Sequence, residues 1–304
     1  MSANAVSPQA DASKLSSVDA TTDVRTVNGV DLHVVAAGDP NDPLVVLLHG
    51  FPEFWYGWHE QIGPLVDAGY RVLVPDQRGY NLSEKPAPVR AYHQKQLSRD
   101  IVELIGSADR DAAHVVGHDW GGMVAWDLAL RHHEVVDRLA IVNAPHPTVF
   151  QRHLRSNPAQ MRRSWYAACF QVPRLPELCC RYDDFRLLER ALRGTSAPGT
   201  FSDADLEHYR RAWSRDGALT AMINWYRASA RYGTNPPRDR VEAPTLLAWG
   251  TDDAALGTEL VVDSYDYCAR EGRRLELFEG TSHWVQHEEP ERLTATLLEH
   301  LGGE

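Results

Sequence analysis

Short apolar runs alternate with longer amphipathic stretches along most of the chain. Runs rich in Val, Leu and Ile occupy residues 44–48, 71–74, 113–116, 138–142, 245–249 and 274–278. Helical periodicity fills the intervals near residues 62–68, 96–108, 121–132, 258–270 and 290–301. A short continuous apolar run that is followed by a helix is typical of a buried parallel strand in a βαβ unit. The pattern therefore predicts an α/β fold with a mostly parallel sheet.

A β-hairpin is expected before the first parallel strand. Asn28 and Gly29 stand between alternating segments at residues 23–27 and 31–36, and Asn-Gly in that setting is a strong hairpin signal.

Residues 1–22 are rich in Ala, Ser and Asp and have neither a basic start nor an apolar core. We therefore expect them to form a disordered tail and not a signal peptide.

One interval breaks the alternation of strand and helix. Between about residues 147 and 237 the sequence contains only helical stretches, such as residues 159–170, 203–215 and 218–232. Ser202 and Asp205 have the spacing of a capping box for the second of these. An all-helical insertion into the α/β core is the simplest explanation. The expected divisions are a tail (1–22), a first core part (23–146), the insertion (147–237) and a second core part (238–304).

Composition and charge limit the classes of partner. The chain has 31 Lys and Arg against 42 Asp and Glu, a formal net charge of -11, and an acidic protein repels phosphate backbones. Its apolar runs are far too short to cross a bilayer. We therefore expect neither a nucleic-acid nor a membrane partner, whereas the oligomeric state is left open. The chain has four cysteines without CxxC spacing, namely Cys169, Cys179, Cys180 and Cys268. This favours free thiols and a cytoplasmic location.

Candidate chemistry lies in the turns that follow the expected strands, because ligands bind beyond the carboxyl ends of the strands of an open α/β sheet. The most informative turn joins a strand to a helix and reads Gly117-His118-Asp119-Trp120-Gly121-Gly122. Gly-x-Asp-x-Gly has the form of a nucleophile elbow with aspartate in the usual place of serine. The dipole of the following helix favours a charged carboxylate at Asp119. The alternative is an aspartate that only caps a helix.

The order of the polar residues strengthens the first interpretation. Asp119 follows one strand, Asp253 a later one and His283 the last, which is the order of nucleophile, acid and histidine in hydrolases with such an elbow. No Gly-x-Ser-x-Gly occurs in the sequence. Asp252 is the nearest rival of Asp253 for the role of the acid.

On these residues the chain resembles the soluble epoxide hydrolases of the α/β-hydrolase superfamily, from about residue 23 to the C-terminus. The motifs that carry the resemblance are His49-Gly50-Phe51-Pro52-Glu53-Phe54-Trp55, the elbow around Asp119, Asn224-Trp225-Tyr226-Arg227 and Ser282-His283-Trp284. The resemblance implies an α/β-hydrolase fold whose helical insertion is a cap between the sixth and seventh core strands. It also implies two cap tyrosines, Tyr226 and Tyr166. The family spacing from Gly250 favours Asp253 as the acid, and Asn143 occupies a position at which some relatives carry it.

A carboxylate suits attack on a saturated carbon that bears a leaving group, and an Asp with a pKa of about 3.9 is ionised at neutral pH. The resemblance implies that Asp119 forms an alkyl ester, that His283 takes a proton from the water that hydrolyses it, and that Asp253 orients His283. The remaining implied site residues are the backbone amides of Phe51 and Trp120 as the oxyanion hole, the phenols of Tyr166 and Tyr226 on the epoxide oxygen, and Trp55 and Trp284 in an apolar pocket.

The expected function is thus hydrolysis of a small-molecule epoxide by water to a vicinal diol. A haloalkane or haloacid dehalogenase is the closest rival, because it would share the Asp-His-Asp triad. A halide needs N–H donors, however, and Phe51 occupies the position where many dehalogenases carry Asn. A non-catalytic receptor of the same fold is the other alternative. No Gly-rich phosphate loop occurs, so no cofactor is expected. His283 and His287 lack an HExxH pattern, so we expect no metal and a surface position for His287.

Overall fold

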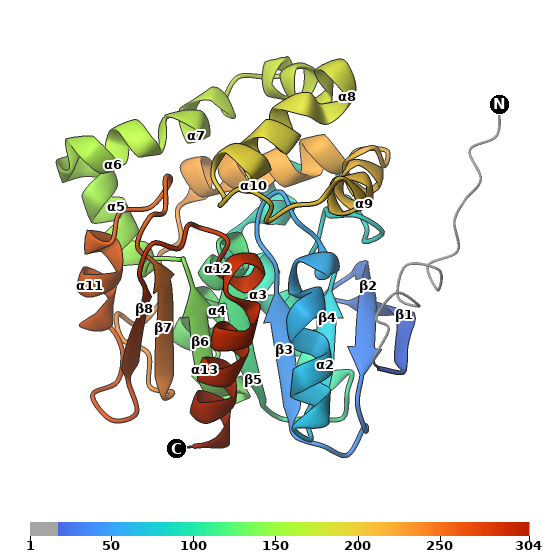
Figure 1. Ribbon diagram of the computed structural model, residues 1–304, viewed down its shortest axis with the longest axis vertical. Helices are drawn as coiled ribbons and strands as arrows, with labels where there is room; N and C mark the ends of the chain where they lie inside the picture. The colour runs from blue at the N-terminus through green and yellow to red at the C-terminus, as the bar shows by residue number, and fades with distance from the viewer. Residues whose placement is uncertain (1–17, 304) are drawn as a thin grey trace.

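An eight-stranded sheet forms the centre of the computed structural model, which describes residues 18–303 (Figure 1). The strands are β1 (Ala20–Val27), β2 (Val30–Ala37), β3 (Leu44–Leu48), β4 (Arg71–Pro75), β5 (Ala113–His118), β6 (Val136–Val142), β7 (Thr245–Gly250) and β8 (Arg274–Phe278). Their order in the sheet is β1-β2-β4-β3-β5-β6-β7-β8. β1 and β2 pair antiparallel, as do β2 and β4, and every other neighbouring pair is parallel. This confirms the predicted α/β fold.

Helices cover both faces of the sheet, which explains why β3 and β7 bury every residue. In Figure 1, α2 (His59–Asp67) and α13 (Pro290–Gly302) lie in front of the strands. Behind them, α3 (Gln94–Gly106) packs on α4 (Trp120–Arg131), which in turn contacts β5 and β6. The core helix α11 (Glu259–Tyr265) and the short helix α12 (Val285–Glu288) complete the second half of the chain.

The helical insertion lies between β6 and β7 and covers the edge of the sheet where the parallel strands end (Figure 1). Its helices are α5 (Pro147–Ser156), α6 (Pro158–Arg163), α7 (Trp165–Cys169), α8 (Leu175–Gly194), α9 (Asp203–Trp213) and α10 (Ala218–Tyr232). The predicted capping box is confirmed, because Ser202 and Asp205 bond reciprocally at the start of α9. The single helix expected over residues 159–170 is wrong, since α6 ends before Ser164 and α7 begins after it.

The N-terminal hairpin is confirmed, with Asn28 and Gly29 at the positive φ angles of 48° and 73° that its tight turn requires. The strand starts earlier than expected. Residues 20–22, assigned to the tail from composition, pair with residues 35–37 in β1 and β2, because backbone hydrogen bonds can recruit polar residues that carry no apolar pattern. The rest of the expected tail, residues 1–17, lies outside the described residues.

No helix within residues 18–303 is both long enough and apolar enough to pass through a membrane.

The contact between α4 and β3 depends on Gly121. A Cβ atom at this position would lie 2.2 Å from the carbonyl oxygen of Leu48, and backbone atoms cannot yield as a flexible side chain can. We expect Gly121→Ala to lower the free energy of unfolding by at least about 1–3 kcal/mol, the typical cost of overpacking. Thermal unfolding measures the effect.

Gly106→Ala is the matched control, because a Cβ atom there would meet open space at the end of α3. It should leave the unfolding temperature unchanged or raise it slightly, since alanine has the higher helix propensity. Equal unfolding temperatures for the two variants would contradict the prediction.

Candidate active site

Asp119 lies at the sharp turn between β5 and α4. Its backbone has φ 49° and ψ -118°, a conformation that costs a non-glycine residue about 1–3 kcal/mol and persists only where the surroundings impose it. The side chain is partly accessible, and its Oδ1 accepts a hydrogen bond of 2.8 Å from the backbone N–H of Phe51. The predicted elbow is thus built as a strained turn that presents a carboxylate.

The turn after β3 approaches Asp119 closely. A Cβ atom at Gly50 would lie only 2.5 Å from the Cβ of Asp119, so only glycine allows this distance. As a result, the amide of Phe51 reaches the carboxylate, in the place predicted for an oxyanion-hole donor. The amide of Trp120, at the first position of α4, stays a prediction.

His283 stands between two carboxylates. Its Nδ1–H donates to Oδ2 of Asp253 at 2.6 Å, and its Nε2 lies 3.7 Å from Oδ2 of Asp119. The structure therefore brings together the three residues proposed as the triad. Asp252, the rival acid, is exposed to solvent, whereas Asp253 is buried.

Asp253 is fixed on both of its oxygens. Oδ1 accepts from the backbone N–H groups of Ala255 and Leu256, at 2.7 and 2.9 Å. Oδ2 accepts 2.7 Å from Nδ2 of Asn143 in addition to His283. Burial alone would raise the pKa of Asp253, but His283 and these donors lower it below its ordinary value, so the group stays an anion. Asn143 thus helps to hold Asp253 in place through its side-chain amide.

The charges around His283 determine its protonation. Burial lowers the pKa of His283, but the nearby carboxylates, first Asp253 and then Asp119, outweigh burial and raise the pKa to about 9. The imidazole is therefore protonated at neutral pH while Asp119 is a free carboxylate. An ester on Asp119 would remove one of the charges that hold this proton.

A buried hydrogen-bond network contacts the backbone of His283. Nε2–H of His118 donates 2.9 Å to the carbonyl oxygen of His283. Glu53 lies next to His118 and also accepts 2.7 Å from the hydroxyl of Tyr209 and 2.7 Å from Nε2 of His287. Burial would raise the pKa of Glu53, but His287 and His118 hold it well below its ordinary range. The expectation that His287 lies at the surface was wrong, because this carboxylate draws its side chain inward.

The two proposed cap tyrosines lie side by side in the wall of the cavity that contains Asp119 and His283. The ring centroids of Tyr166 on α7 and Tyr226 on α10 are 6.0 Å apart, and both rings line a cavity of about 590 Å³ with Asp119 and His283. Burial and the neighbouring Asp119 raise the pKa of both phenols. Both therefore remain protonated and able to donate hydrogen bonds at neutral pH.

Arg227 ties the two tyrosine-bearing segments together. Its guanidinium donates to the carbonyl oxygens of Phe170 and Val172, at 3.0 and 2.9 Å, and pairs at 2.7 Å with Glu177. In the sequence, Arg227 stands out only as the last residue of the motif Asn224-Trp225-Tyr226-Arg227. In the structure it is the buried link from α10 to the chain that follows α7.

The two tryptophans predicted for the pocket differ in their positions. Trp284 lines the cavity and donates 2.9 Å from Nε1 to Oγ1 of Thr195. Trp55 does not line it, so that prediction was wrong. The short helix η1 (Trp55–Trp58) leads directly into α2, and this path buries the ring of Trp55 in the core with 1% of its surface exposed.

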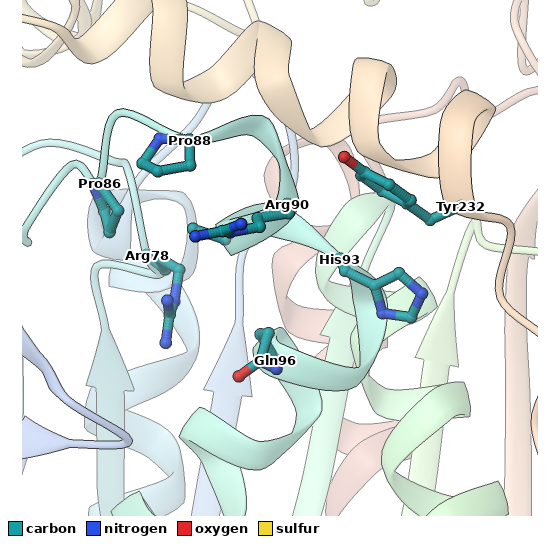
Figure 2. Close-up of a pocket in the computed structure, with 8 residues that line it drawn as sticks. Arg78, Pro86, Pro88, Arg90, His93, Gln96 and Tyr232 are labelled. Atoms are coloured by element: carbon teal, nitrogen blue, oxygen red, sulfur yellow. The ribbon is translucent and has the colours of Figure 1, made fainter.

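A second hollow of about 470 Å³ lies elsewhere, where the loop before α3 meets the end of α10 (Figure 2). Arg78, Arg90, His93 and Tyr232 line it. Arg78 is already bound to both oxygens of Asp100, at 2.7 and 2.6 Å. This hollow contains none of the predicted site residues. Within the described part of the chain, no group of three or more His, Cys, Asp or Glu residues could hold a metal ion.

Several known proteins are similar to this chain. Residues 43–290 match the family described as alpha/beta hydrolase fold. The chain is 44% identical over 275 residues to AB hydrolase superfamily protein YfhM of Bacillus subtilis, covering 90% of this chain and 95% of that protein. It is 39% identical over 277 residues to Epoxide hydrolase 1 of Caenorhabditis elegans, covering 90% and 68%.

Among solved structures, it is similar to a single-site variant of an epoxide hydrolase from Bacillus megaterium complexed with its product, a naphthyloxy-propanediol. The TM-score is 0.83 at 29% identity, and the match covers 92% of this chain and 100% of that one.

The charge of Asp119 is expected to contribute directly to the proton affinity of His283. Asp119→Asn should lower the pKa of His283 below about 9, because it removes one of the two nearby carboxylates that raise it. Because the raised pKa stabilises the folded state, this contribution is complete below about 6.5 and disappears as the pH rises through about 9. Histidine NMR titration measures the first effect, and unfolding at several pH values measures the second.

Asp252→Asn is the control, because the exposed Asp252 lies outside the triad. It should leave the titration of His283 unchanged. Identical midpoints for the wild type and Asp119→Asn would contradict the assignment.

Proposed function

Because the chain belongs to the α/β-hydrolase fold family and is close to the epoxide hydrolases, we propose that it hydrolyses an epoxide to a vicinal diol through an ester on Asp119. The observation that carries this proposal is the arrangement of the cavity. A carboxylate that contacts His283 on one side shares an apolar cavity with two protonated phenols, Tyr166 and Tyr226. A carboxylate and a pair of phenols are suited to open a strained cyclic ether.

In the first half of the reaction, Oδ2 of Asp119 attacks an epoxide carbon. The C–O bond of the ring breaks as the new ester C–O bond forms, and the released oxygen takes a proton from Tyr166 or Tyr226. Oδ1 keeps its hydrogen bond to the amide of Phe51. An ordinary alkoxide is a poor leaving group, so the phenols supply the acid that this step needs.

In the second half, water attacks the ester carbonyl carbon of Asp119 and gives its proton to His283. With the charge of Asp119 gone, only Asp253 of the two triad carboxylates still favours the protonated ring, so the pKa of His283 falls. The imidazolium first gives its proton to the phenolate left by ring opening, and the neutral ring then accepts the proton from water. The negative oxygen of the tetrahedral intermediate forms where Oδ1 already accepts from Phe51. Collapse breaks the bond from carbon to Oδ2, and the diol leaves with that oxygen and with the proton that His283 returns to it. One water oxygen stays in Asp119, and the proton of the regenerated carboxyl group passes to His283.

The relatives support a small-molecule substrate. The Bacillus megaterium variant is complexed with its product, a naphthyloxy-propanediol. The cavity of this chain is apolar, with Phe51, Phe170 and Trp284 among its lining residues. A dehalogenase would use the same triad, but the proposed phenols of Tyr166 and Tyr226 match an epoxide oxygen better than a halide.

Purified protein should therefore convert styrene oxide to its diol and release no bromide from butyl bromide. Asp119→Ala should abolish diol formation without unfolding the chain, because it removes the nucleophile. A single turnover in water labelled with a heavy oxygen isotope should place the label in Asp119, detected by peptide mass. Bromide release without diol, or a diol that carries the label while Asp119 does not, would contradict the mechanism.

The two phenols are expected to share the activation of the epoxide oxygen. Tyr166→Phe and Tyr226→Phe should each slow ester formation by roughly 10- to 100-fold, the usual value of one hydrogen bond to a charged group. The double variant should be far slower than either single variant. Single-turnover kinetics measures ester formation, and Tyr232→Phe, on the exposed end of α10, is the control. Equal rates for the single and double variants would count against shared activation.

A further inference from the structure

Residues 158–194 of the helical insertion carry most of the large apolar side chains that the described residues leave exposed. Of the ten large hydrophobic residues exposed within residues 18–303, seven fall between residues 158 and 194. They include Trp165, Leu178 and Tyr182, which are 66%, 65% and 79% exposed. The short helix α7 buries none of its residues. Figure 1 shows α6, α7 and α8 along the rim of the molecule farthest from the sheet. We call the exposed surface of residues 158–194 the outer cap face.

This face is positively charged, whereas the protein as a whole is acidic. Residues 158–194 contain seven arginines and four carboxylates, a net charge of +3. The other 24 basic and 38 acidic residues leave -14 on the rest of the chain. The charge is therefore strongly asymmetric between the outer cap face and the body.

The carboxylates of the outer cap face are all paired with arginine. Glu177 pairs with Arg227, Asp183 with Arg186, and both Asp184 and Glu189 with Arg210. Five exposed arginines have no carboxylate within 4.0 Å among the residues that the structure describes: Arg162, Arg163, Arg174, Arg181 and Arg190. The free charge of the outer cap face is therefore positive.

We infer that the outer cap face docks onto an anionic lipid surface. Large apolar side chains beside arginines fit the boundary between lipid headgroups and acyl chains. There the apolar side chains lose contact with water, and the arginines approach the lipid phosphates. The acidic body would be repelled by such a surface, which orients the insertion toward it. A symmetric pair of copies would instead place the same arginines against each other.

The apolar surface continues from the outer cap face into the catalytic cavity. Trp165, Leu175 and Leu187 are at least half exposed and also line the cavity that contains Asp119. Docking would thus bring the cavity entrance to the lipid phase, where apolar small molecules accumulate. This consequence rests on the proposed function, but the docking does not. The expectation of no membrane partner was based on apolar runs too short to cross a bilayer. It therefore does not apply to a protein that docks at the surface of one.

Sedimentation of the full chain with lipid vesicles tests the inference. The wild type should bind vesicles of phosphatidylcholine mixed with about one third phosphatidylglycerol at least tenfold better than vesicles of phosphatidylcholine alone, because each basic residue near an anionic surface contributes roughly fivefold in affinity. High salt should weaken this binding, since it screens the charges.

Two pairs of variants separate the apolar and the charged contributions. Trp165→Ser with Leu178→Ser should lower binding at least tenfold. Val24→Ser with Val262→Ser should not, because these two residues lie elsewhere, although they are also more than half exposed, at 63% and 55%. Arg174→Glu with Arg181→Glu should lower binding to the anionic vesicles by roughly 30-fold or more. Arg240→Glu with Arg270→Glu is its control, because both residues are exposed outside the insertion.

Several results would overturn the inference. One is that the wild type binds both kinds of vesicle equally, or binds neither. Another is that the control variants lose as much binding as the test variants. The wild type could also form a dimer in sedimentation velocity that Trp165→Ser abolishes, which would make the outer cap face a self-association interface. Circular dichroism checks folding, and if the serine pair is unfolded, the arginine pair decides alone.

Discussion

The site is organised around the charge of Asp119, held at the edge of an apolar cavity. An isolated carboxylate in such a place is costly, so it needs compensating partners. The amide of Phe51 and the imidazolium of His283 supply them at 2.8 and 3.7 Å. These residues follow β3, β5 and β8, which are not consecutive in the sequence. Only a sheet in which the strands run parallel brings their carboxyl ends to one edge and so assembles the site.

The same charge links the two halves of the proposed reaction. In the free protein, Asp253 and Asp119 together overcome the effect of burial on the pKa of His283. Esterification removes only the contribution of Asp119, while Asp253 remains fixed by Asn143 and two backbone amides. In the proposed reaction, His283 therefore becomes able to act as a base once there is an ester to hydrolyse, because the charge that held its proton is reduced.

Local patterns predicted the parts of the structure that depend on local physics. Strands that are buried on both faces read as apolar runs, and the order of Asp119, Asp253 and His283 follows from the order of the strands. The errors concern distant contacts. Nothing near Trp55 or His287 in the sequence shows that one ring enters the core and that the other is drawn to Glu53, which is 234 residues away. The role of Arg227 likewise depends on carbonyl groups more than 50 residues before it.

The insertion also restrains its two tyrosines unequally. Tyr226 lies on α10, which buries ten of its residues against the rest of the molecule, whereas Tyr166 lies on α7, which buries none. Segments with few buried contacts have the lowest local stability. Tyr226 is therefore the fixed phenol, and the position of Tyr166 depends on the link through Arg227 and on whatever contacts the exposed side of α7. Since Trp165 is the neighbour of Tyr166 on that helix, the surface inferred to meet the lipid and the proposed acid are one residue apart.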